Sequence, residues 1–307
     1  MRVTAGTASS APAVGLLGVP TSAGSHNAGQ DKAPGVLRAA GLAERLAAHG
    51  IGVRDFGDLP VARHRPQPPV DGVRDLGRVS TVVGQTADRV SEIREAGLVP
   101  LIIGGDCTIT LGVVGGVARR EDAGLVYFDG DADLSLPATS GSGVLDTMGM
   151  THLLGDGVPA LSRSGPRFPL LRPGQVELFG FDPGELDTGE WSRLTGLGLH
   201  ATPAPAVRED PAGRAAAALS RLESEAGAVV VHFDVDVLDT GAFPLANFPH
   251  FAGLTLEEAA ACLGIFCRSG KLAGLVVTEV NPDHDPDAIM VPALIDTLCD
   301  ALRPAGG

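Results

Sequence analysis

Two runs of β-branched and aromatic residues in this chain each end in a cluster of aspartates. Residues 126–133 are VYFDGDAD, and residues 229–239 are VVVHFDVDVLD. Such runs are typical of buried parallel strands, and ligands bind at the carboxyl ends of the strands in an open α/β sheet. Five acids could therefore meet at one sheet edge: Asp129, Asp131, Asp133, Asp234 and Asp236. Because like charges in a cleft repel one another and neither run holds Lys or Arg, a divalent cation is the simplest neutralising group.

Strand-like and helix-like segments alternate along almost the whole chain. This pattern predicts an α/β fold of three layers, α/β/α, with a mostly parallel sheet of about eight strands. We expect strands at residues 14–19, 52–56, 99–103, 125–129, 175–180, 199–202, 229–234 and 275–280. We expect helices at residues 34–49, 78–96, 108–119, 148–154, 212–225, 256–268 and 288–302. Residues 1–12 are predicted to be a tail, residues 61–69 and 156–174 surface loops, and residues 13–307 a single domain.

Composition excludes several classes of protein. The formal net charge is −14 and comes without a basic stripe, so nucleic acid is not an expected partner. No apolar stretch reaches membrane-spanning length, and four widely spaced cysteines favour reduced thiols, so we expect a cytoplasmic protein that acts on a small molecule. The sequence leaves the oligomeric state open, with a homo-oligomer as one option.

A third predicted strand ends in a glycine turn. Residues 101–108 are LIIGGDCT, and the two glycines allow a sharp turn into the next helix. Cys107 is thereby placed at or near the helix N-terminus, where the helix dipole lowers the pKa of a thiol. A thiolate at this point could bind a metal, although taken alone such a cysteine is more often a small apolar residue of the core.

In combination and in this order, GGDC, DGDAD and DVDVLD resemble the ureohydrolase family of arginases, agmatinases and their relatives. Three further segments are similar to the family: residues 28–42 (AGQDKAPGVLRAAGL), the Ser/Thr-rich residues 137–143, and residues 278–282 (TEVNP). The cysteine of GGDC resembles a branch of the family that includes an N-omega-hydroxy-L-arginine hydrolase.

This resemblance implies an arginase-like fold in which two manganese ions are bridged by a hydroxide, which attacks a guanidino carbon so that a C–N bond is cleaved. A single manganese ion is the alternative. It implies that Asp129 and Asp234 bridge the ions, that Asp133 binds the first and Asp236 the second. It also implies that Glu279 holds the guanidinium of the substrate. Hydroxyls of the Ser/Thr-rich region are the implied substrate-binding groups: Ser135, Ser140 and Ser142.

Three residues depart from the family pattern. Cys107 stands where the family has a histidine ligand of the first metal, and Asp131 where it has a histidine ligand of the second. We expect both to be ligands in their place. Asp146 aligns with the acid/base histidine, and we expect it to carry protons with a pKa raised by the neighbouring acids. Both nitrogen ligands are therefore predicted to be lost.

The departures make the predicted site more negative than the family pattern. Carboxylates favour Mn²⁺, Mg²⁺ or Ca²⁺, whereas the thiol favours softer metals. We expect a hydrolase of a modified guanidine or amidine in specialised metabolism. Val144 stands where arginases present an asparagine, so L-arginine is a poor candidate. The alternative is a catalytically impaired relative with a binding or structural role, which the lost histidines favour and the retained acids oppose.

Other interpretations fit less well. A dehalogenase-type phosphotransferase would need its DxD near the chain start and a later lysine motif, and an EF-hand would need a turn glycine and a distal glutamate that DGDAD lacks. Five histidines are predicted to face solvent: His26, His49, His64, His200 and His250. His152 and His284 lie near the predicted cleft, but we do not assign either as a replacement proton carrier.

Overall fold

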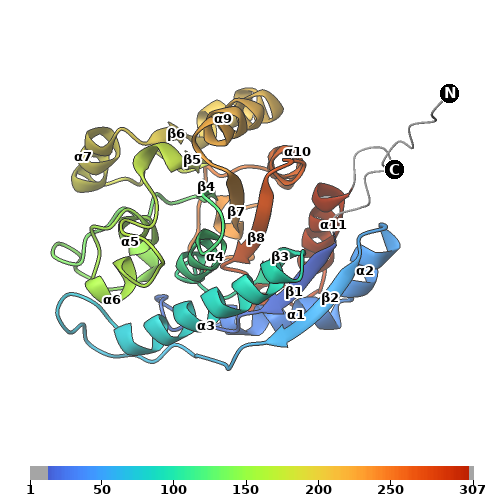
Figure 1. The fold of residues 1–307 in the computed structure, drawn as a ribbon, viewed down its shortest axis with the longest axis horizontal. Coiled ribbons are helices and arrows are strands. Elements are labelled where there is room, and N and C mark those ends of the chain that lie inside the picture. Colours follow the sequence, from blue (N-terminus) through green and yellow to red (C-terminus); the bar gives the residue numbers. More distant parts are fainter. Residues whose placement is uncertain (1–12, 304–307) are drawn as a thin grey trace.

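Eight parallel strands form one sheet in the order β2-β1-β3-β8-β7-β4-β5-β6 (Figure 1). The structure is a computed structural model that describes residues 13–303; the predicted tail at residues 1–12 lies outside them. The strands are β1 Val14–Gly18, β2 Val53–Asp58, β3 Val99–Ile103, β4 Ala123–Phe128, β5 Val176–Phe179, β6 His200–Thr202, β7 Ala228–Asp234 and β8 Leu272–Thr278. Each predicted strand is present, and the predicted fold class is confirmed.

Helices cover both faces of the sheet. They are α1 Ala33–Ala39, α2 Leu42–Ala48, α3 Leu76–Glu95, α4 Ile109–Ala118, α5 Gly149–Leu153, α6 Pro159–Ser162, α7 Thr188–Leu197, α8 Ala204–Glu209, α9 Pro211–Glu225, α10 Leu256–Cys267 and α11 Met290–Leu302. One core contains residues of α1, α2 and α9–α11, and the other contains residues of α3–α5. Figure 1 shows the strands between α3 and α4 on one side and α10 and α11 on the other. Within residues 13–303, none of the helices has both the length and the apolar character needed to cross a bilayer.

The strands contribute alternate residues to the two cores. Leu101 and Ile103 of β3 pack with α1, α2 and α9–α11, whereas Ile102 packs with α3 and α4 on the opposite face. This follows from the two-residue period of a strand, and because both faces are covered, β3 is apolar throughout. The apolar runs used to predict the strands are thus explained by burial on both sides.

Several helical segments differ from the prediction. Residues 34–49 form two helices instead of one, because Gly41 adopts a left-handed conformation (φ 84°) between α1 and α2. Residues 156–174 are not only surface loop, since they contain α6 and bury Leu161, Leu170 and Leu171. Helices α7 and α8 were not predicted, because α7 buries only Leu194 and so has a weak apolar period, and α8 has only 6 residues.

The topology brings four strand ends together. Strands β3, β8, β7 and β4 are consecutive neighbours in the sheet, so the segments that follow them meet at one edge. After β3, a Cβ atom at Gly105 would lie 1.8 Å from the carbonyl oxygen of Thr21, so only glycine allows this turn to pack against the loop that follows β1. The aspartate-rich segments of the sequence lie at this same edge.

Candidate metal centre

A cavity of about 230 Å³ opens at the carboxyl ends of the central strands. Eight acidic residues line it: Asp129, Asp131, Asp133, Asp146, Glu185, Glu190, Asp236 and Glu279. Cys107 and Gln30 also line it, whereas no Lys or Arg does among residues 13–303. The cavity therefore presents a strongly negative surface to whatever enters it.

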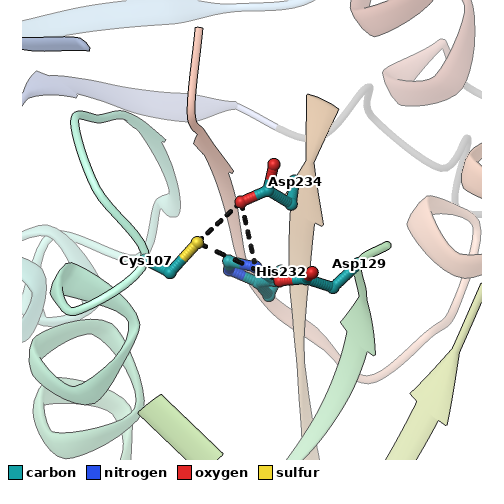
Figure 2. Close-up of side chains that lie close together, drawn as sticks. All are labelled: Cys107, Asp129, His232 and Asp234. Carbon is teal, nitrogen blue, oxygen red and sulfur yellow. Dashed lines mark hydrogen bonds and ion pairs between the residues drawn. The ribbon is translucent and has the colours of Figure 1, made fainter. Parts of the chain in front are cut away.

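Cys107, Asp129 and Asp234 converge at the inner end of the site, together with His232 (Figure 2). One possible ligand atom from each residue lies within 4.8 Å of the others. The Cys107 Sγ is 2.6 Å from Asp234 Oδ2 and 4.0 Å from Asp129 Oδ2. Asp234 Oδ2 also accepts a hydrogen bond of 2.9 Å from the Thr278 hydroxyl on the adjacent strand β8. Sulfur and carboxylate oxygens thus face a single point.

His232 holds Asp129 in place. Its Nε2 is 3.0 Å from Asp129 Oδ2, and its Nδ1 is 2.7 Å from the hydroxyl of Thr110 on α4. Tyr127 is its register partner on β4, and the two rings stack with centroids 4.2 Å apart. Burial lowers the pKa of His232 to about 3, so the ring is neutral and its single N–H can be donated to the carboxylate.

Asp131, Asp236 and His250 form a second group, in which one possible ligand atom from each residue lies within 4.8 Å of the others. Asp131 is half-buried, and its amide donates to Asp129 Oδ1 at 2.7 Å. The amide of Gly130 donates to Asp236 Oδ1 at 3.0 Å. Burial opposes protonation of His250, but the carboxylates of Asp131 and Asp236 outweigh it and raise the pKa of the imidazole to about 12. The prediction that His250 faces solvent is wrong, because the residue is 1% exposed.

Asp133 and Glu279 both adopt backbone conformations that are rare for residues other than glycine. Their φ angles are 49° and 61°. Asp133 Oδ2 accepts a hydrogen bond from the hydroxyl of Tyr127, and the Glu279 amide donates to the carbonyl of Gly105 at 2.9 Å. Residues held in sparsely populated conformations cluster at functional sites. Both acids are therefore held in fixed directions at the cavity wall.

Asp146 and Glu279 lie beside Cys107 in the cavity. The Cys107 amide donates to Asp146 Oδ1 at 2.7 Å, so one oxygen of this half-buried carboxylate is fixed. The Gln30 side chain donates to Glu279 Oε2 at 2.7 Å. The other oxygen, Oε1, is buried and has no hydrogen-bond partner among residues 13–303. An unpaired buried carboxylate oxygen is costly, and here it is available to a ligand.

The three predicted substrate-binding serines lie in two places. Ser135 lines the cavity and donates to Glu190 at 3.0 Å. Ser140 and Ser142 instead line a neighbouring pocket, which shares Ser135 and Glu190 with the cavity. Their hydroxyls are 3.3 Å apart, and they accept hydrogen bonds from the amides of the following turn.

Burial and mutual repulsion raise the pKa of most carboxyls in the cluster. The pKa of Asp129 lies well above its ordinary value because of burial and then the charges of Asp236 and Asp234. Burial is also the main cause that raises the pKa values of Asp133 and Asp146. For Asp146 this direction agrees with the prediction from the sequence. The pKa of Asp236 moves in the opposite direction, since the interaction with His250 outweighs burial and lowers it.

The expected lowering of the Cys107 pKa is wrong for this arrangement. Burial and then the charge of Asp234 raise the pKa of the thiol well above its ordinary value. A bound cation would reverse this balance, because it favours the deprotonated form of every group that faces it. The donor set of carboxylates with one thiol and nearby imidazoles therefore fits divalent metal ions.

Most of the predicted metal ligands lie in one of two groups, and each group also contains a histidine that the sequence motifs did not indicate. His232 and His250 stand beside the acids although neither occupies a family histidine position. His232 could have been suspected as a lone polar residue in an apolar strand, two residues before Asp234 and so on the same face. No local pattern distinguished His250. His152 and His284 do not line the cavity, in agreement with the prediction.

Replacing His232 by phenylalanine should weaken metal binding. Phenylalanine can keep the stacking with Tyr127 but removes the imidazole contact to Asp129 Oδ2. We expect the affinity for Mn²⁺ to fall by about 10- to 100-fold, the usual effect of removing a group that orients a metal ligand. Calorimetric titration of folded His232→Phe protein would show this, and an unchanged affinity would mean that His232 only supports packing.

Comparisons with known proteins agree with this fold. A model described as the arginase family matches residues 12–302. Human Arginase-1 is 30% identical over 275 residues, which covers 88% of this chain and 85% of the relative. The arginase structure from Bacillus caldovelox has a TM-score of 0.86 at 26% identity and covers 97% of this chain and 100% of that chain. Proclavaminate amidino hydrolase from Streptomyces clavuligerus shares the fold with a TM-score of 0.69 at 20% identity, over 95% of this chain and 90% of that chain.

Proposed function

Since this chain belongs to the arginase family, we propose that it is a metal-dependent hydrolase that cleaves a C–N bond of a guanidino, N-hydroxyguanidino or amidino compound. The observation that carries the proposal is the free, buried Oε1 atom of Glu279 in an acidic cavity beside the candidate metal ligands. A planar cation with several N–H donors, which all three compound classes can present, satisfies such a carboxylate.

We assign metal-binding and substrate-orienting roles to the residues of this edge of the sheet. Cys107, Asp129, Asp133 and Asp234 would hold one ion, and Asp131 and Asp236 would contribute to a second. Bound divalent ions, for which Mn²⁺ is the best candidate, lower the pKa of water and stabilise negative charge that develops on the substrate. Glu279 would orient the substrate through Oε1 while Gln30 fixes Oε2. These assignments use only side chains that the fold already brings to one edge of the sheet.

Asp146 is the proposed proton carrier. Its Oδ1 is held by the Cys107 amide, which leaves the other oxygen of the carboxyl for proton exchange at the cavity wall. Burial and then the charge of Asp106 raise its pKa well above the ordinary value, which moves it toward the range in which a carboxyl can give and take protons near neutral pH. Ser135 would contact the remainder of the substrate at the mouth of the cavity.

The charge of the cavity favours substrates that carry no uncompensated negative group. No Lys or Arg among the described residues lines it, whereas Glu185, Glu190 and Asp131 do. An anionic substrate would meet repulsion there, and a cationic one would be drawn in.

A hydrolysis screen tests the proposal. Protein loaded with Mn²⁺ would be incubated with guanidino, N-hydroxyguanidino and amidino compounds, with chelator-treated protein as the control, and release of the amine or urea-type product would be measured. We expect metal-dependent turnover of at least one class. No turnover by protein that demonstrably holds metal would contradict the proposal and favour a non-catalytic role.

Changing Gln30 to leucine should impair the positioning of Glu279. The substitution keeps a similar volume but removes the 2.7 Å hydrogen bond to Oε2, and it leaves both carboxylate oxygens without a partner. We expect kcat/KM to fall about 10-fold, the size of one lost hydrogen bond to a charged group, with metal content unchanged. Gln67→Leu, in an exposed loop, is the matched control. Equal kcat/KM for the two variants would refute the positioning role.

A further inference from the structure

We propose that His250 is a nitrogen ligand of a second metal position, which it forms with Asp131 and Asp236. The inference rests on the proposed metal-dependent function, and it assigns to a loop residue a role that the sequence motifs did not suggest. His250 follows the aspartate-rich segment after β7 and reaches back to the turn after β4.

The distances suit three ligands of one ion better than they suit hydrogen bonds. His250 Nε2 lies 3.6 Å from Asp131 Oδ2 and 3.7 Å from Asp236 Oδ2. These separations exceed ordinary hydrogen-bond lengths. Two donors that each bind a metal at about 2.1 Å are separated by about 3.0 to 3.5 Å. A small shift of the side chains would place His250 Nε2, Asp131 Oδ2 and Asp236 Oδ2 around one ion.

The opposite side of the ring has the partner that a metal-bound imidazole requires. His250 Nδ1 lies 3.1 Å from Glu185 Oε1. Histidines that bind a metal through one nitrogen usually present the other N–H to a carboxylate, which fixes the tautomer and the ring direction. Nδ1 would thus face Glu185 while Nε2 faces the two aspartates.

The imidazole ring of His250 is buried, and the backbone that carries it is held by hydrogen bonds. His250 is 1% exposed, yet neither ring nitrogen makes a hydrogen bond of good geometry within residues 13–303. Its amide donates to the Thr240 hydroxyl at 2.9 Å, and its carbonyl accepts from the Thr240 amide at 2.8 Å. A Cβ atom at Gly130 would lie 2.7 Å from the ring, so the imidazole packs directly on this turn. A buried polar ring without hydrogen bonds points to a missing partner.

A rival arrangement makes a different prediction. A protonated His250 could itself neutralise Asp131 and Asp236, in which case the site would hold a single ion beside Cys107. The number of ions per chain separates the two possibilities, because a ligand supports a second ion and an internal cation replaces it.

Metal counting tests the proposal. Wild-type protein, His250→Leu and the control His26→Leu would be loaded with Mn²⁺, desalted and measured by elemental analysis. His26 lines the same cavity but belongs to neither group of candidate ligands. We expect about two ions per chain in the wild type and in the control, and about one in His250→Leu. If His250→Leu does not fold, His250→Asn is counted in its place with the same expectation.

The outcomes distinguish this inference from the proposed function. Two ions in both wild type and the His250 variant, or one ion in both, would overturn the role of His250 while leaving a metal site in place. No metal in the wild type would overturn the proposed metal-dependent function as well. Return of the second ion in the double variant Asp131→His, His250→Leu would support the inference, since Asp131 is within 3.6 Å of the ring nitrogen that it would replace.

Discussion

Adding Mn²⁺ to chelator-treated protein is expected to raise its melting temperature by roughly 5 to 10 °C, because ligand at about 100 times Kd contributes about 2.7 kcal/mol per site. The physical reason is the group of buried carboxyls of Asp129, Asp133 and Asp234. Burial and the charges of neighbouring acids raise their pKa values. Ionising them in the folded protein without a cation is unfavourable. Bound metal removes this penalty only in the folded state, so it stabilises the fold.

Asp234→Asn should remove most of this thermal shift. Asp234 accepts from Cys107 and Thr278 and lies fully buried in the inner group, so its substitution disturbs the centre of the donor set. Asp88→Asn is the matched control, since Asp88 pairs with Arg119 on the protein surface. The account would be contradicted if the two variants responded to Mn²⁺ equally, or if Mg²⁺, Mn²⁺ and Ca²⁺ all left the wild-type melting temperature unchanged.

Asp146→Asn is expected to lower kcat by about 10²- to 10⁴-fold on whichever substrate the screen identifies, the usual contribution of a positioned acid or base. Asparagine can still accept the hydrogen bond from the Cys107 amide, so the local structure should be kept. It cannot, however, exchange a proton at the remaining position. Metal content should therefore stay at the wild-type level while turnover falls.

Two measurements make this test specific. Elemental analysis of Asp146→Asn separates lost proton transfer from lost metal, and Asp300→Asn on the surface provides a variant with the same chemical change. Full activity of Asp146→Asn would show that the carboxyl has no catalytic role and that the departure from the family pattern is only structural.

The strands and the acidic site could be predicted because their signals are local. An apolar run such as residues 229–231 is explained by burial on both faces of the sheet. The aspartates that follow the strand converge with those of its neighbour because the two strands are parallel. The short helix α7 carried a local signal too, because Asp187 and Glu190 form a capping box at its start. Its half-exposed, weakly apolar sequence concealed the helix from the periodicity analysis.

The surroundings of the acids could not be predicted, because they depend on contacts between distant parts of the chain. Gln30 meets Glu279 across 249 positions, and His232 meets Asp129 across 103. His250 lies in a loop that carries no periodic pattern, so only the folded backbone shows that it turns inward. The prediction for the pKa of Cys107 was wrong for the same reason. The helix N-terminus is visible in the sequence, whereas the burial and the neighbouring carboxylates that raise the pKa of the thiol come from distant parts of the chain.

Anomalous diffraction at the manganese edge, from crystals grown with Mn²⁺, would locate the ions at the ends of the central strands. We expect one peak among Cys107, Asp129, Asp133 and Asp234, and a second among Asp131, Asp236 and His250. The peaks should vanish from crystals soaked in chelator. An anomalous map without a peak at this sheet edge, from protein that is folded at neutral pH, would contradict the claim that the strand-end acids form a metal centre.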